Sequence, residues 1–175
     1  MLYDAVWLAS DDLMKKQQGR KALIVLSDGV DRGSKETFSS AIAEAQRADT
    51  LVYSVLFKGE EGRGLGGGHF GGMHGGIGPM GGGGRRQYPR QEERPDGKKV
   101  LQQISEETGG RLFEVSGKQP IDKIYAQIEE ELRNQYSLGY TTEGPDAEIG
   151  YHRIHLVAKQ KGLAVQARDG FYADR

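Results

Sequence analysis

Several residue types and patterns are missing from this chain of 175 residues. It has no cysteine, which excludes disulfides, thiolate metal sites and cysteine nucleophiles, and a cysteine-free chain suits either redox environment, so the compartment stays open. No apolar run approaches the roughly 18 residues of a membrane span, and Met1 is not followed by the pattern of a signal peptide. The formal net charge is only -1, so no overall basic field favours nucleic acid as a partner.

Catalytic motifs are also missing. The sequence contains no Gly-x-Ser-x-Gly, no phosphate-binding loop ending in Lys-Ser/Thr, and no paired His-carboxylate arrangement. We therefore expect a protein without enzymatic activity.

The first two-thirds of the chain alternates between helical and strand patterns. Amphipathic spacing predicts a helix over Met1–Gln18 and three further helices. The second has Ser34 or Thr37 as its N-cap, the third has Asp96 as its N-cap, and the fourth begins with Pro120 as its first helical residue. Continuous apolar runs predict buried strands at Lys21–Leu26 and Leu51–Phe57, and a third short strand at Arg111–Val115. This alternation is typical of an α/β fold with a parallel sheet and helices on both faces.

The pattern changes after Asn134. Apolar residues alternate with polar or small ones at Tyr136–Tyr140, Ile154–Leu156 and Leu163–Ala167, which predicts three antiparallel strands. We divide the chain into an α/β body (residues 1–57 and 96–134), a glycine-rich flexible insertion (58–95) and a C-terminal β extension (135–175).

The insertion holds most of the glycine. Of 27 glycines in the chain, 15 lie between Gly59 and Gly84. Imidazole and thioether side chains in the same segment could bind soft or borderline metal ions, which makes a metal-handling protein one alternative function; they are His69, Met73, His74 and Met80. The alternative interpretation is a disordered insertion in which these His and Met residues have no role in binding a metal ion.

The segment Lys21–Asp31, an apolar strand followed by Ser27-Asp28-Gly29, resembles the strand-to-loop segment of a von Willebrand factor type A domain. The order of the surrounding segments resembles the bacterial, largely acidobacterial, VWFA-related family over essentially the whole chain except the glycine tract. The segments that carry this resemblance are Leu2–Ala5, Gly19–Gly29, Ala41–Val55, Leu101–Phe113, Gln135–Tyr140 and Arg168–Tyr172.

The resemblance implies a Rossmann-like, doubly wound fold with a metal-ion-dependent adhesion site for Mg²⁺ or Mn²⁺ at the carboxyl ends of the strands. Only Asp28 matches a ligand of that site, because the chain has no Asp-x-Ser-x-Ser and the family's Thr would fall before Leu2. A site reduced to Asp28 predicts weak Mg²⁺ binding or none. Ser27, Asp28, Gly29 and Asp31 are the candidate partner-binding residues, although a polar turn at the end of a strand explains the same residues.

Because the chain lacks these ligand motifs of the family, it resembles a von Willebrand A fold that is truncated at its N-terminus. The missing first strand would pair with Ala22–Leu26, which is thus expected to form a hydrophobic sheet edge that seeks a preceding polypeptide or a second copy. The resulting hypothesis is a protein-protein interaction or adhesion module with a degenerate or absent metal site. A non-functional fragment is the remaining alternative.

Overall fold

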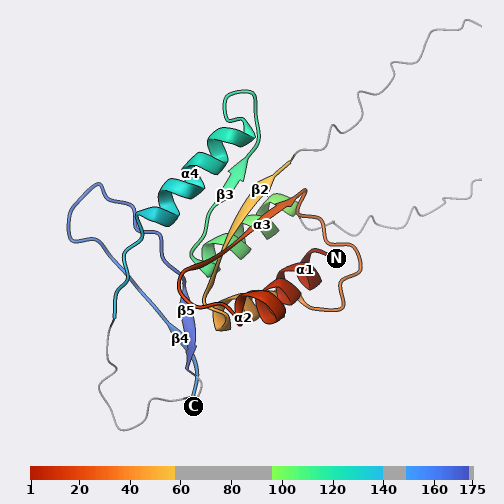
Figure 1. Ribbon diagram of the computed structural model, residues 1–175, viewed down its shortest axis with the longest axis horizontal. Helices are drawn as coiled ribbons and strands as arrows, with labels where there is room; N and C mark the ends of the chain where they lie inside the picture. Colours follow the sequence, from red (N-terminus) through yellow and green to blue (C-terminus); the bar gives the residue numbers. More distant parts are fainter. Residues whose placement is uncertain (58–95, 140–148, 174–175) are drawn as a thin grey trace, which may run out of the picture.

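The computed structural model describes residues 1–57, 96–139 and 149–173. Three parallel strands lie side by side in the order β1 (Lys21–Ser27), β2 (Thr50–Leu56) and β3 (Leu112–Glu114) (Figure 1). The register runs from Lys21 opposite Thr50 to Ser27 opposite Leu56, and Ser54 lies opposite Leu112. The predicted parallel sheet is confirmed for these three strands.

Helices pack on both faces of this sheet. The helices α1 (Leu2–Leu8), α2 (Phe38–Arg47) and α3 (Gly97–Thr108) share one hydrophobic cluster with Val52 and Leu56 of β2. The helix α4 (Ile121–Arg133) covers the other face, where Ile124 and Ile128 pack with Tyr53 and Val55. Because the strands follow one another in one direction across the sheet, α2 and α3, which connect them, lie on the same face.

The ends of these helices follow from local hydrogen bonding. Thr37 caps α2 in a capping box with Ser40, and the Asp96 side chain accepts a hydrogen bond from the Lys98 N–H at the start of α3. Gly109 ends α3 in the left-handed conformation that glycine adopts without strain. Pro120 is the N-cap of α4 and Ile121 is the first helical residue, whereas the sequence predicts Pro120 itself as the first helical residue.

The first helix differs from its predicted range of Met1–Gln18. The regular α-helix ends at Leu8 and is followed by a π-helical segment, η1 (Ala9–Met14). Residues 15–18 are not helical. The Ser10 hydroxyl donates to the Val6 carbonyl at 2.7 Å, which is the kind of local competition that disturbs helical bonding.

Strand β1 is less buried than its apolar sequence predicts. Its residues from Lys21 to Val25 are half-buried and Leu26 is exposed, whereas β2 is almost entirely buried. The reason is position: β2 lies between two strands, while β1 pairs with β2 alone in the part of the chain that the structure describes. The expectation that Ala22–Leu26 forms a sheet edge is met in those residues.

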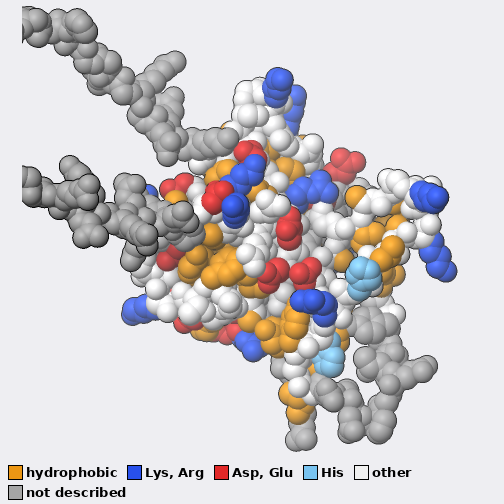
Figure 2. Space-filling model, turned by 180° about the vertical axis from the view of Figure 1, so that it is seen from behind, with side chains coloured by type: hydrophobic (Ala, Val, Ile, Leu, Met, Phe, Trp, Pro, Cys, Tyr) orange, Lys and Arg blue, Asp and Glu red, His pale blue; other side chains and the backbone are white. Residues whose placement is uncertain are grey.

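The C-terminal extension forms two antiparallel strands in the described residues instead of the three predicted. They are β4 (Gly150–Arg153) and β5 (Gly170–Ala173), with Gly150 opposite Ala173. The alternating residues from Ile154 to Leu156 and from Leu163 to Ala167 lie in an arm, residues 154–169, that forms no strand and whose Leu156, Val157 and Leu163 side chains are exposed. Figure 2 shows hydrophobic side chains along this arm. Side-chain alternation indicates an extended backbone but does not supply a neighbouring strand, which is why this prediction was wrong.

The segment 135–139, predicted as another strand, has no regular structure, and Tyr140 lies outside the described residues. The glycine-rich insertion with His69, Met73, His74 and Met80 also lies outside them. No helix among the described residues is long and apolar enough to cross a membrane.

Candidate interaction site

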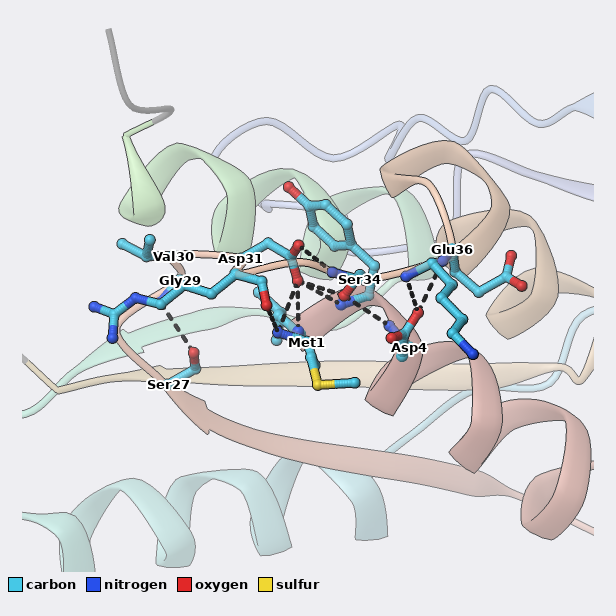
Figure 3. Close-up of polar contacts among 12 residues, drawn as sticks. Met1, Asp4, Ser27, Gly29, Val30, Asp31, Ser34 and Glu36 are labelled. Carbon is cyan, nitrogen blue, oxygen red and sulfur yellow. Dashed lines mark hydrogen bonds and ion pairs between the residues drawn. The ribbon is translucent and has the colours of Figure 1, made fainter. Parts of the chain in front are cut away.

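The turn after β1 is built from short hydrogen bonds between neighbouring residues. The Ser27 hydroxyl accepts from the Gly29 N–H at 3.0 Å, and Asp28 Oδ1 accepts from the Val30 N–H, also at 3.0 Å (Figure 3). Asp28 Oδ2 lies 3.8 Å from the Arg32 guanidinium, and the Asp28 side chain is 52% exposed. Asp28 is therefore held by a local turn while its carboxylate stays open to solvent.

Two glycines bring this turn against the start of α3. Gly29 has φ of +77°, and a Cβ on it would lie 2.0 Å from the Gly97 carbonyl oxygen. A Cβ on Gly97 would in turn lie 2.2 Å from the Asp28 carbonyl oxygen. The close approach of the two backbones thus requires glycine on both sides. Gly29 was among the predicted partner-binding residues, whereas Gly97 was not predicted, because its only signal in the sequence is its place beside the Asp96 cap.

Asp31 points away from the turn and holds the start of α1 (Figure 3). Its Oδ1 accepts from the Leu2 N–H at 2.6 Å, the Tyr3 N–H at 3.4 Å and the Ser34 hydroxyl at 2.5 Å, and it lies 3.2 Å from the Met1 ammonium. Its Oδ2 accepts from the Ser34 N–H at 3.1 Å. Since no side chain of the N-cap residue Met1 caps α1, Asp31 performs that role from a distant part of the chain.

Burial of Asp31 opposes its ionisation. The hydrogen bonds from Ser34, the terminal ammonium and the Leu2 N–H outweigh that effect and lower the pKa of Asp31 well below its ordinary value. The negative charge also lies at the N-terminus of α1, where it is favourable.

Asp4 forms the reverse connection from α1 to the loop. Its Oδ1 accepts from the Lys35 N–H at 2.9 Å and from the Glu36 N–H at 2.8 Å, and its own N–H donates to the Ser34 hydroxyl at 3.3 Å. Asp4 and Asp31 therefore join α1 to the segment between β1 and α2. Sequence analysis placed Asp4 in a helical first turn but not in this network.

The side-chain oxygens near Asp28 are engaged in hydrogen bonds within the described part of the chain. Mg²⁺ requires several converging oxygen ligands in an octahedral shell. Ser27 accepts from the turn, and Asp31 already accepts from four hydrogen-bond donors in α1 and Ser34. Within the described residues, no group of three His, Asp or Glu side chains could hold a metal ion.

The open edge of β1 is the second feature of this region. The Phe57 N–H donates to the Ser27 carbonyl at 3.3 Å, so Ser27 directs its backbone groups toward β2. Backbone direction alternates along a strand, so Ala22, Ile24 and Leu26 direct their N–H and C=O groups away from β2. The Leu26 side chain is 48% exposed, and no second strand pairs with this edge in residues 1–57, 96–139 and 149–173.

A hollow of about 280 Å³ lies between α2, α3 and the β4–β5 ribbon. Hydrogen bonds beside it join these elements: Gln46 of α2 donates to the Glu107 carbonyl of α3 at 2.9 Å, and the Asp169 N–H, just before β5, donates to the same carbonyl at 3.3 Å. Arg47 lies 4.3 Å from the centre of the Tyr172 ring, in a cation-π contact. This region is a docking contact within the chain.

Comparison with protein-family models, with curated proteins and with solved structures gives no match.

Proposed function

We propose that this chain is a non-catalytic protein-interaction module that takes up an extended segment of a partner along the open edge of β1. The observation that carries the proposal is the row of outward-directed backbone groups at Ala22, Ile24 and Leu26, in an apolar strand that pairs on one side among the described residues. Strand addition to such an edge is a common mode of recognition, in which main-chain hydrogen bonds provide affinity and alternate side chains provide specificity.

The proposal includes the von Willebrand A resemblance and a Rossmann-like arrangement. Three parallel strands in sequential order, with helices on both faces, support this arrangement. It differs from the adhesion mechanism that the resemblance implies, because docking at a strand edge needs no bridging cation. Asp28 alone provides too few ligands for one.

The test is a selection of displayed random peptides on the immobilised full chain, followed by NMR of the selected peptide bound to isotope-labelled protein. We expect peptides with alternating apolar residues. On binding, the amide signals of Ala22, Ile24 and Leu26 should shift more than those of Leu23 and Val25, whose N–H groups already face β2.

Two variants with the same substitution provide the control. Leu26→Lys places a charge on the edge, whereas Leu8→Lys places one on the exposed surface of α1, where Leu8 is 53% exposed. Peptide binding should be lost in the first and retained in the second. Binding that leaves the three edge amides unshifted, or that survives in Leu26→Lys, contradicts the proposal, as does a selection that enriches no peptide.

A further inference from the structure

Within the part of the chain that the structure describes, the edge of β1 lacks the features that usually keep sheet edges apart. Natural edge strands are protected by inward charges, proline, bulges or a covering segment. From Ala22 to Leu26 this edge has no charge and no proline, and charged side chains occur only at its ends, with Arg20 and Lys21 before it and Asp28 after it. The ends therefore carry opposite charge.

Because of this charge pattern, two copies of the β1 edge that meet antiparallel bring opposite charges together. Two copies that meet through the same edge are related by a two-fold axis, and their strands then run antiparallel. With the axis at Ile24, each Ile24 lies opposite its equivalent, and Ala22 lies opposite Leu26 of the second copy. The same register places Arg20 opposite Asp28 of the second copy, twice in the dimer, and Lys21 opposite the uncharged Ser27.

Neighbouring registers are poorer. Moving the axis to Leu23 places Leu26 opposite Arg20 of the second copy, and moving it to Val25 places Ala22 opposite Asp28. Each shift sets an apolar residue against a charge, and Arg20 no longer faces Asp28. The axis at Ile24 pairs all three outward residues on both chains, and opposite charges directly across an antiparallel pair are stabilising.

We propose that a second copy of this chain docks antiparallel on the β1 edge, with the two-fold axis at Ile24. This inference rests on the proposed function, for which it names the partner. The two three-stranded sheets become one continuous sheet. Ala22 and Ile24 pack toward the α4 face, so both α4 helices lie on the same side of that sheet. The contact involves one short strand from each copy, so the interface is small and the dimer dissociates on dilution.

Sedimentation velocity of the full chain over a dilution series tests the association. We expect dimer at high concentration and monomer on dilution, and a dissociation constant at least about tenfold larger for Leu26→Lys because a charge then replaces one of the three outward-directed apolar residues, opposite Ala22 of the second copy. Leu8→Lys should associate like the original chain. A chain that stays monomeric at every concentration, or unchanged association in Leu26→Lys, overturns the inference.

Charge reversal tests the register and remains informative if Leu26→Lys fails to fold. Arg20→Glu places a carboxylate opposite Asp28, and Asp28→Arg places a guanidinium opposite Arg20, so each single variant should dimerise more weakly. The double variant R20E/D28R restores the opposite charges and should recover dimerisation. Failure of the double variant to exceed both single variants, while all three melt like the original chain, overturns the two-fold axis at Ile24.

The peptide experiment separates this inference from the function on which it rests. If the chain is monomeric but peptides shift the edge amides, the second copy is not the partner and the interaction module stands. If the chain dimerises without perturbing those amides, the dimer uses another surface and the inference fails. If neither dimer nor peptide reaches the edge, both proposals fail.

Discussion

Asp31 shows how a single carboxylate organises the region after β1. Its side chain is 15% exposed and links the loop to the first backbone N–H groups of α1. Because its pKa is lowered from an ordinary value of 3.8, its stabilising effect is fully present above about pH 4. The effect is lost as the pH falls further, since the unfolded chain takes up the proton more readily than the folded chain.

We expect Asp31→Asn to lower the free energy of unfolding at neutral pH by about 1.5–3 kcal/mol, the value of hydrogen bonds to a charged group. The variant should also lose less stability than the original chain between neutral pH and the acid range. Urea unfolding at several pH values measures both effects. Asp28→Asn is the matched control on an exposed carboxylate; an equal loss in both variants would show that the contacts to α1 are unimportant.

Gly97 is a residue at which helix propensity and packing predict opposite results. It is the first residue of α3, where alanine would favour the helix, yet a Cβ there would lie 2.2 Å from the Asp28 carbonyl oxygen. Packing is the larger effect, so Gly97→Ala should destabilise the fold by about 1–3 kcal/mol. Gly117→Ala, in open space, should change little, and thermal unfolding compares the two. A more stable Gly97→Ala would show that the turn and α3 are not in contact.

At the scale of elements, the β4–β5 ribbon depends on α2 for its position. The Tyr172 ring contacts Arg47 and lies 5.1 Å from the Tyr151 ring, measured between ring centroids. A two-stranded ribbon is only marginally stable by itself, so its order depends on such contacts. The ribbon is thus an accessory to the α/β body in the described residues.

We expect Tyr172→Ala to release the ribbon at a cost of about 0.5–2 kcal/mol in docking, the range for a cation-π contact. Hydrogen exchange followed by mass spectrometry should show faster exchange in residues 150–153 and 170–173, with little change in β2. Tyr172→Phe keeps the ring and should exchange like the original chain. Faster exchange in both variants would assign the effect to the hydroxyl group instead of the ring.

At the scale of the whole molecule, the proposed docking does not depend on divalent ions. Asp28 lacks converging oxygen partners among the described residues, so millimolar Mg²⁺ should leave the melting temperature unchanged and give no heat attributable to Asp28 in calorimetry. The same measurements on Asp28→Ala are the control. A stabilisation by Mg²⁺ that disappears in Asp28→Ala would restore the adhesion site that the resemblance implies.

Much of the fold follows from sequence patterns. Apolar runs located β1 and β2, and amphipathic spacing located α2, α3 and α4, because burial of one helix face or of a whole strand leaves a periodic record in the chain. The caps at Thr37 and Asp96 were also predictable, since a helix start needs a local hydrogen-bond acceptor. The strands of the C-terminal extension were not predictable, because alternating apolar residues at Ile154–Leu156 indicate an extended backbone but do not identify a partner strand.

The sequence by itself determined the alternating elements, the absence of an Asp-x-Ser-x-Ser motif and the apolar character of Ala22–Leu26, all of which depend on residue type and local spacing. Tertiary structure decided the rest. It placed the Asp31 carboxylate at the start of α1, where it accepts hydrogen bonds from backbone N–H groups, and it brought Gly29 against Gly97, which lies far along the chain. It also directed the backbone groups of Ala22, Ile24 and Leu26 outward. These outcomes depend on which segments meet in space, and contacts between distant segments leave no periodic signal in a single sequence.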